Sequence, residues 1–339
     1  MLVTLLSCDG SSVPAGALGP VVLGGELADQ LGAPLETVLV GGTEVTDDIR
    51  DTLSNYGVSR VHLVSDELLS DVNPEAWGVA LAHLVSKLRP DGVVAAGSDL
   101  GTEVMARIAA RTGLPLATNC TVVRAGDQAA DPWRLTRLRG GGVLWEDAEL
   151  EAETKLVTIA SGAVSDDAPS GRERAAEVAV ETFHPELDRS IVRTRIVEHT
   201  SAGTGLSLAT APVVVSGGRG VGSAEGFAVL EELAGLIGGA VGCSRVATNN
   251  GWRSHSDQVG QTGTKIAPKL YIASGISGAT QHWAGCMGAK NILAINTDPE
   301  APMVTKADYA VIGDVQEVLQ GVVEEVQRRR SDREGVAVG

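Results

Sequence analysis

The chain has 339 residues, of which 43% are hydrophobic and 21% are charged, and its formal net charge is −16. At about 100–200 residues per domain, this length predicts two domains whose cores need no disulfides. The acidic net charge argues against a nucleic-acid binder. No run of about 18 apolar residues occurs, which argues against a transmembrane helix. The four cysteines form no Cys-x-x-Cys pair, which argues against a disulfide scaffold or a thiolate zinc site.

The first half alternates apolar runs with segments of helical spacing. Runs suited to buried parallel strands lie at Leu2–Leu6, Thr37–Val40, Val61–Val64 and Val93–Ala96. Helical spacing occurs between and after them, at Gly25–Leu31, Asp47–Tyr56, Pro74–Leu88 and Thr102–Arg111. This alternation predicts βαβ units around a parallel sheet.

A β-rich stretch follows. The predicted strands are Thr121–Arg124, Arg134–Leu138, Gly142–Trp145 and Leu156–Ala160, which we expect to form an antiparallel extension that closes the first domain. Residues 164–211 are rich in charge, Pro, Gly, Ser and Thr, and Ile191–Val197 is a candidate last strand before the domain boundary.

The second half predicts another α/β domain. Its strands are Pro212–Ser216, Ala240–Gly242, Leu270–Ala273, Ile292–Ile295 and Tyr309–Ile312, and its helices are Ser223–Ile237, Thr280–Met287 and Val315–Arg330. The expected fold is therefore α/β with two doubly wound parallel-sheet domains, at residues 1–200 and 201–330, and a flexible tail at 331–339. Residues 1–199 carry 16 basic and 30 acidic residues, net −14, so the two halves differ in surface charge.

The first eight residues contain a motif similar to a lipoprotein cleavage site. Leu5-Leu6-Ser7-Cys8 resembles a lipoprotein cleavage site, but no basic segment precedes it and six residues are too few for the apolar core of a signal peptide. We therefore expect a cytoplasmic protein without membrane insertion.

A glycine-rich turn opens the second domain. Gly217-Gly-Arg-Gly-Val-Gly222 lies between a predicted strand and a predicted helix, where backbone N–H groups favour an anion. Its spacing fits neither the dinucleotide fingerprint nor a P-loop, so an anion site and a plain tight turn both remain open. Arg219 within the turn favours the anion site, because a guanidinium can bind a pyrophosphate with two hydrogen bonds.

Polar and glycine-rich segments lie next to the ends of the predicted strands of this half. They are Ser244-Arg245, Gln258–Gly263, Ser274–His282, Asn296 and Asp314. Ligands of open α/β sheets bind outside the carboxyl ends of the strands. The clustering therefore predicts a large, elongated, polar ligand such as a dinucleotide.

Two other chemistries are weaker. Ser277 lies in a near match to a nucleophile elbow, but Ala279 replaces the glycine that this elbow requires. His282 and Cys286 lie four residues apart and could share a metal, yet no further ligand has the right spacing, so no metal site is expected.

Several motifs occur together and in order in the second half. They are Val214-Val-Ser-Gly-Gly-Arg-Gly220, Gly242-Cys-Ser-Arg245, Gln258-Val-Gly-Gln-Thr-Gly263, Leu270-Tyr-Ile-Ala-Ser-Gly-Ile-Ser-Gly-Ala279, Gln281-His282, Ala294-Ile-Asn-Thr-Asp-Pro-Glu-Ala-Pro302 and Ala307-Asp-Tyr309. This half resembles the alpha subunit of electron transfer flavoproteins, the family that includes FixB-type proteins. Gly101–Cys120 and the β segment that ends near Ala163 resemble the family's first domain more loosely.

The resemblance implies FAD as the cofactor and a role for each motif. It places Arg219 at the pyrophosphate, Arg245 over the isoalloxazine ring and Thr262 at flavin N5, and it gives Arg245, Thr262 and His282 the task of tuning the flavin. It places Gln281 and His282 at the pyrimidine side and ribityl chain, Ser277 near the phosphates, and Asn296 and Asp314 at the adenosine. The full set of expected cofactor-binding residues is Gly218, Arg219, Gly220, Ser244, Arg245, Gln258, Gly260, Gln261, Thr262, Gly263, Ser274, Gly275, Ser277, Gly278, Gln281, His282, Asn296 and Asp314.

The resemblance also implies a non-enzymatic electron carrier. Its partners would be an electron transfer flavoprotein beta subunit, which forms the heterodimer with the first domain as scaffold, flavoprotein dehydrogenases as electron donors, and a quinone reductase or another downstream acceptor. Two alternatives stay open at this point: a nucleotide-binding regulatory module without a redox role, because a fold alone proves no function, and a bifurcating electron transfer flavoprotein.

Overall fold

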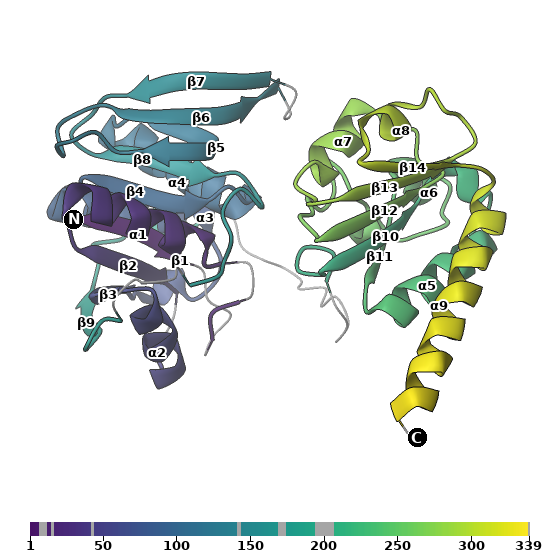
Figure 1. Cartoon of the computed structure of the whole chain (residues 1–339). Helices are drawn as coiled ribbons and strands as arrows, with labels where there is room; N and C mark the ends of the chain where they lie inside the picture. Colours follow the sequence, from purple (N-terminus) through teal and green to yellow (C-terminus); the bar gives the residue numbers. More distant parts are fainter. Residues whose placement is uncertain are drawn as a thin grey trace. The chain divides into compact units, whose positions relative to one another are not determined.

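The computed structural model describes residues 1–6, 12–14, 17–41, 44–140, 144–168, 174–193 and 207–337, with side chains up to Ser331. The chain divides into two compact units, Met1–His199 and Thr200–Gly339 (Figure 1). In the described ranges no helix is long and apolar enough to cross a membrane.

Unit 1 is built on a large, mostly parallel sheet. Its strands are β1 (Leu2–Leu6), β2 (Leu35–Val40), β3 (Arg60–Val64), β4 (Gly92–Ala96), β5 (Leu116–Arg124), β6 (Trp133–Arg139), β7 (Leu144–Leu150), β8 (Lys155–Ile159) and β9 (Ala179–Phe183). Over the described residues the strand order is β7-β6-β5-β8-β4-β1-β2-β3-β9. The central part therefore reverses direction between β1 and β4, as in a doubly wound fold.

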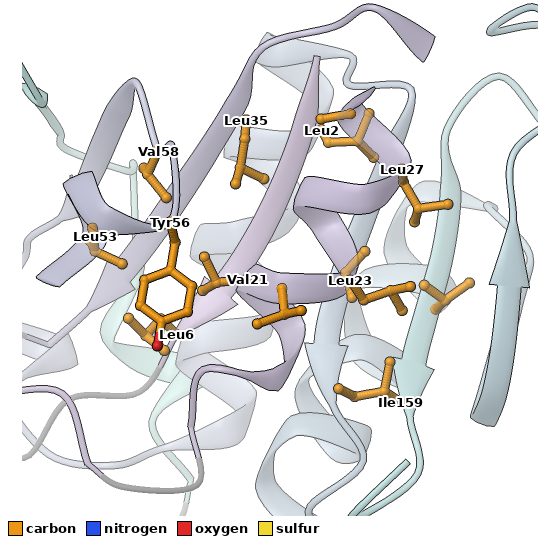
Figure 2. Close-up of a cluster of buried hydrophobic side chains, with 14 of the residues drawn as sticks. Leu2, Leu6, Val21, Leu23, Leu27, Leu35, Leu53, Tyr56, Val58 and Ile159 are labelled. Atoms are coloured by element: carbon orange, nitrogen blue, oxygen red, sulfur yellow. The ribbon is translucent and has the colours of Figure 1, made fainter. Parts of the chain in front are cut away.

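Helices cover both faces of this sheet. They are α1 (Gly19–Leu31), α2 (Asp47–Asn55), α3 (Pro74–Leu88) and α4 (Asp99–Thr112). One apolar cluster joins α1 and α2 to the sheet, and Figure 2 shows Val21 and Leu27 of α1 beside Leu2 and Leu35 of the strands. A second cluster joins α3 and α4 to the sheet's other face. Burial on both faces explains why these strands are nearly continuous apolar runs.

The predicted strands of unit 1 are present in the described residues, although residues 142–143 of the predicted strand Gly142–Trp145 lie outside them. The pairing of the strands differs from expectation in two places. β5, β6 and β7 are antiparallel neighbours, as expected, whereas β8 pairs in parallel with β4 and β5 and so belongs to the main sheet. The prediction of a strand at Ile191–Val197 is wrong for residues 191–193, because Arg189–Ile191 is a 3₁₀ turn and residues 192–193 are not in a strand. Residues 194–197 lie outside the described residues. The outermost strand is instead β9, which pairs in parallel with β3.

Unit 2 is a smaller doubly wound unit. Its described strands are β10 (Val213–Gly217), β11 (Ala240–Cys243), β12 (Leu270–Ser274), β13 (Ile292–Asn296) and β14 (Tyr309–Ile312), all parallel and in the order β11-β10-β12-β13-β14. The chain reverses its direction of winding between β10 and β12. The crevice outside the carboxyl ends of those two strands is the expected ligand position for such a sheet.

The helices of unit 2 pack on both faces of its sheet. They are α5 (Ala228–Ile237), α6 (Arg245–Asn249), α7 (Thr280–Cys286), α8 (Pro302–Lys306) and α9 (Val315–Ala337). α5 and α9 pack with Val215 of β10 on one face, whereas Val214 points to the other face with Cys286 of α7 and Met303 of α8. α9 continues past Arg330, the predicted helix end, to Ala337.

Candidate functional site

A cavity of about 490 Å³ lies at the carboxyl edge of the unit 2 sheet. Its volume is typical of a small-molecule or cofactor site. It is lined by Arg219, Gly220, Ser244, Arg245, Val246, Asn249, Gln258, Val259, Gly260, Gln261, Thr262, Gly275, Ile276, Ser277, Gly278, Ala279, Gln281, His282, Asn296, Asp298 and Ala301. These residues come from the loops after β10, β11, β12 and β13, so the cavity spans the winding reversal of the sheet.

Two glycine turns meet at one end of the cavity. The N–H of Gly218 donates to the carbonyl of Ser274 at 2.9 Å, and the N–H of Gly220 donates to the carbonyl of Gly275 at 3.0 Å. A Cβ at position 220 would lie 2.7 Å from the Gly275 Cα, and Gly275 itself has φ +64°. Side chains are thus excluded here by direct backbone contact, which leaves backbone groups to form this part of the site.

The cavity contains arginine charges that no neighbouring carboxylate neutralises. Arg219 and Arg245 are exposed, and in the described part of the chain neither makes an ion pair. Arg253, nearby in the sequence, differs: it pairs with Glu231 and Asp257. Unpaired guanidinium groups in a concave site favour an anionic ligand such as a phosphate.

A chain of side-chain hydrogen bonds ends at Thr262, the residue predicted to contact the flavin. Thr262 lines the cavity, and its Oγ1 accepts a hydrogen bond from Nε2 of Gln258 at 3.0 Å. Oε1 of Gln258 accepts from Oγ1 of Thr248 at 3.1 Å, and the Thr248 hydroxyl also lies 2.9 Å from the carbonyl oxygen of Arg245. Gln258 is only 4% exposed, so this buried amide connects the loop of Thr262 to helix α6.

His282 is a buried, neutral histidine. Its Nε2 lies 2.7 Å from the hydroxyl of Tyr271, which is fully buried in β12, and the two rings are stacked with centroids 6.2 Å apart. Burial lowers the pKa of His282 to about 4. This imidazole is therefore uncharged near neutral pH, and a flavin-tuning role for His282 would not rest on a charge.

Most of the predicted site residues line the cavity, and four do not. Ser274 is fully buried in β12, and Gly218 and Gly263 pack against backbone atoms of Gly275 and Gln258. Asp314 accepts hydrogen bonds from the N–H groups of Gln316 and Glu317, so it caps the beginning of α9. These four positions shape the loops around the cavity, and their contact with a ligand stays a prediction.

Other lining residues carried no sequence signal of their own. Val246, Asn249, Val259, Ile276, Ala279, Asp298 and Ala301 also line the cavity. Apolar members such as Val246 resemble core positions in the sequence, since nothing in their pattern separates a cavity wall from a packed interior. Tyr271 and Thr248 lie behind the lining residues, and only the three-dimensional structure reveals their contacts.

Three cysteines of the described residues, Cys120, Cys243 and Cys286, are free and buried. Burial raises the pKa of Cys286 to about 12, so its thiol stays protonated. Across the described ranges no group of three or more His, Cys, Asp or Glu side chains is arranged to hold a metal ion.

Comparison with known proteins identifies the family. A family model described as the electron transfer flavoprotein domain matches residues 21–187, and one described as the electron transfer flavoprotein FAD-binding domain matches residues 207–287. Electron transfer flavoprotein subunit alpha of Thermoanaerobacterium thermosaccharolyticum is 33% identical over 309 residues, which cover 89% of this chain and 90% of that protein. The chain belongs to the family of electron transfer flavoprotein alpha subunits.

Two further relatives extend this result. Electron transfer flavoprotein subunit alpha of Mycobacterium tuberculosis is 36% identical over 303 residues, covering 89% of this chain and 92% of that protein. Protein FixB of Bradyrhizobium diazoefficiens is 34% identical over 296 residues, covering 86% of this chain and 79% of that protein. The matched FAD-binding domain contains most of the cavity lining, so FAD is the cofactor that belongs to this electron transfer flavoprotein domain.

The cavity residues fit FAD chemically. The unpaired guanidinium groups of Arg219 and Arg245 suit a cofactor with a pyrophosphate and an electron-accepting ring. The close contact of Gly220 with Gly275 leaves backbone groups at one end of the site, where they suit a phosphate. The Thr262 hydroxyl accepts a hydrogen bond from Gln258 and can make a polar contact with the edge of the ring.

Proposed function

We propose that this chain binds FAD in the unit 2 cavity and carries electrons as the alpha subunit of a heterodimeric electron transfer flavoprotein. The observation that carries the proposal is the pair of unpaired cavity arginines, Arg219 and Arg245, at the carboxyl edge of a sheet that lies in the FAD-binding domain match. The match of the cavity region to an FAD-binding domain favours this carrier over a nucleotide-binding regulatory module.

Three groups of residues divide the work of holding the cofactor. We assign Arg219, Gly220 and Ser277 to the phosphates, because they surround the meeting point of the two glycine turns. Asn296, whose amide donates to the Ile276 carbonyl at 3.0 Å, is assigned to the adenosine side. The ring side is assigned to Arg245, Thr262 and His282 by the resemblance to the family.

The bound flavin supplies the redox chemistry, and the protein supplies binding and electrostatics. Arg245 places a fixed positive charge in the cavity, which favours the ring whenever it gains negative charge. At an effective dielectric constant of about 20, a unit charge about 4 Å away contributes about 4 kcal/mol before desolvation costs. His282 lines the cavity as a neutral imidazole that can form hydrogen bonds, because its pKa of about 4 keeps it uncharged near neutral pH.

The wider assignment concerns partners. We propose that unit 1 is the scaffold for the beta subunit, that flavoprotein dehydrogenases supply the electrons, and that a quinone reductase or another downstream protein accepts them. The net charge of −14 over residues 1–199 supports different roles for the two halves, since a protein that exchanges partners benefits from a charged surface.

The test is to purify the chain with its beta subunit and follow its absorbance during reduction. We expect a yellow complex whose flavin bands disappear when a cognate dehydrogenase and its substrate are added, and reappear when an acceptor is added. A complex that binds FAD but exchanges electrons with no dehydrogenase would contradict the carrier role. A colourless complex that rejects FAD would contradict the whole proposal.

A further inference from the structure

The position of Gln258 is unusual for a residue at a cofactor cavity. It is 4% exposed, and both ends of its side-chain amide are already engaged, with Thr262 on one side and Thr248 on the other. Each end of the amide keeps a second hydrogen-bonding position, because the nitrogen carries two protons and the oxygen two lone pairs. The two contacts that are formed connect Gln258 to Thr262, a neighbour that lines the cavity.

The order of donors and acceptors decides what Thr262 can do. A threonine hydroxyl has one proton and can also accept. Because Nε2 of Gln258 donates to Thr262, the Thr262 oxygen is used as an acceptor, and its own proton is available to the cavity. If the amide were turned by 180°, Oε1 would face Thr262, the hydroxyl would donate to Gln258, and the cavity would face an oxygen lone pair.

The other side of the amide is occupied as well. The Thr248 hydroxyl lies 3.1 Å from Oε1 of Gln258 and 2.9 Å from the Arg245 carbonyl oxygen, and its one proton serves both acceptors. The backbone of Gln258 is fixed, since its N–H donates to the His255 carbonyl and its carbonyl accepts from the N–H of Thr264. These contacts keep the amide between the two threonines, and the first experiment below tests which end of it faces Thr262.

We propose that Gln258 is a positioning residue that directs the hydroxyl proton of Thr262 into the cofactor cavity. This inference rests on the proposed function for its consequence, since the group that would accept the proton is an edge of the flavin ring. The relay itself runs through Thr248, Gln258 and Thr262 and exists in the chain without FAD.

The first experiment uses the full chain without FAD. Glutamine side chains are labelled with ¹⁵N, and the Nε2 proton signals of Gln258 are identified by their loss in Gln258→Leu. We expect Thr262→Val to move the hydrogen-bonded Nε2 proton upfield, because it removes the acceptor, and Thr262→Ser to restore it. Thr248→Val is the matched control: it should shift this proton less than Thr262→Val does. The reverse pattern would show that Nε2 faces Thr248, and it would overturn the proposal.

The second experiment uses the complex reconstituted with FAD that carries ¹⁵N at N5 of the ring. We expect Gln258→Glu to move the N5 resonance in the same direction as Thr262→Val, because a carboxylate only accepts and so draws the Thr262 proton away from the cavity. Gln258→Leu, which neither donates nor accepts, should cause a smaller shift. In a Thr262→Val background, Gln258→Glu should add little.

The double variant separates positioning from a simple charge effect. An N5 shift from Gln258→Glu that is equally large with and without the Thr262 hydroxyl would overturn the proposal, and so would the lack of any shift. A complex that binds no FAD would instead contradict the proposed function, while the measurement on the FAD-free chain would still decide whether Gln258 orients Thr262.

Discussion

Acid should weaken unit 2 through one buried imidazole. Burial lowers the pKa of His282 to about 4, and the side chain is 7% exposed, whereas an unfolded chain has the ordinary histidine pKa of about 6.5. Between these two values the unfolded chain binds more protons than the native chain. The free energy of unfolding therefore falls as the pH drops through this window, and the stabilisation by neutral His282 is fully present only above about pH 6.5.

The size of the effect follows from the shift. A difference of about 2.5 pKa units corresponds to at most about 3 kcal/mol, and about 2 kcal/mol of this is lost on going from about pH 7 to about pH 5. Replacing His282 by Gln keeps a neutral polar group beside Tyr271 and removes the titration. The wild-type chain should therefore lose about 2 kcal/mol more stability than His282→Gln over this range.

Urea unfolding of the full chain at the two pH values measures this difference. Tryptophan fluorescence reports on the unfolding of both units, because Trp252 and Trp283 belong to unit 2 and the other three tryptophans to unit 1. Groups that titrate in both chains cancel in the comparison, so the difference reports on residue 282 alone. Equal losses of stability in the two chains would refute the reasoning that His282 is held neutral by burial.

Three further predictions concern caps, glycines and charge. Asn73→Ala removes a side chain that caps α3 through two backbone N–H groups, and it should lower the free energy of unfolding by about 1 kcal/mol in urea titrations. Gly220→Ala places a Cβ within 2.7 Å of the Gly275 Cα, so it should lower the free energy of unfolding by about 1–3 kcal/mol and weaken FAD binding in a fluorescence titration. Gly235→Ala, which has open space in α5, should raise the free energy of unfolding by about 0.5–1 kcal/mol. Arg245→Ala should still fold but lower the flavin reduction potential in a spectroelectrochemical titration, and an unchanged potential would contradict the role of its charge.

The buried strands of both units could be predicted from the sequence because each is a short apolar run. The strand β9 could not, since Ala179–Phe183 lies at a sheet edge and alternates exposed with half-buried positions amid charged residues. The parallel pairing of β8 was also beyond the sequence, because periodicity identifies a strand but not its neighbours. The start of α1 at Gly19 was missed because its first turns contain glycine and proline, which are rare in helix interiors.

The candidate site followed from position rather than from any single motif. Arg219, Arg245 and Thr262 are far apart in the chain, yet the rule that ligands lie outside the carboxyl ends of parallel strands brings them to one cavity. The same rule gave no sign that Asp314 caps helix α9, which the structure shows. Nor could it reveal that Tyr271 bonds to His282, because a tyrosine within an apolar strand looks like any core residue.

The central claim is that the unit 2 cavity binds FAD through its unpaired arginines, and a binding titration tests it most directly. FAD is titrated into the complex with the beta subunit, prepared from the wild-type chain, from Arg219→Glu, and from Lys290→Glu, which reverses an exposed charge in the same unit outside the cavity lining. We expect Arg219→Glu to weaken FAD binding by about tenfold or more, because it puts a carboxylate where a phosphate should lie, and Lys290→Glu to bind as the wild type does. Equal affinities for the wild type and Arg219→Glu would contradict the account.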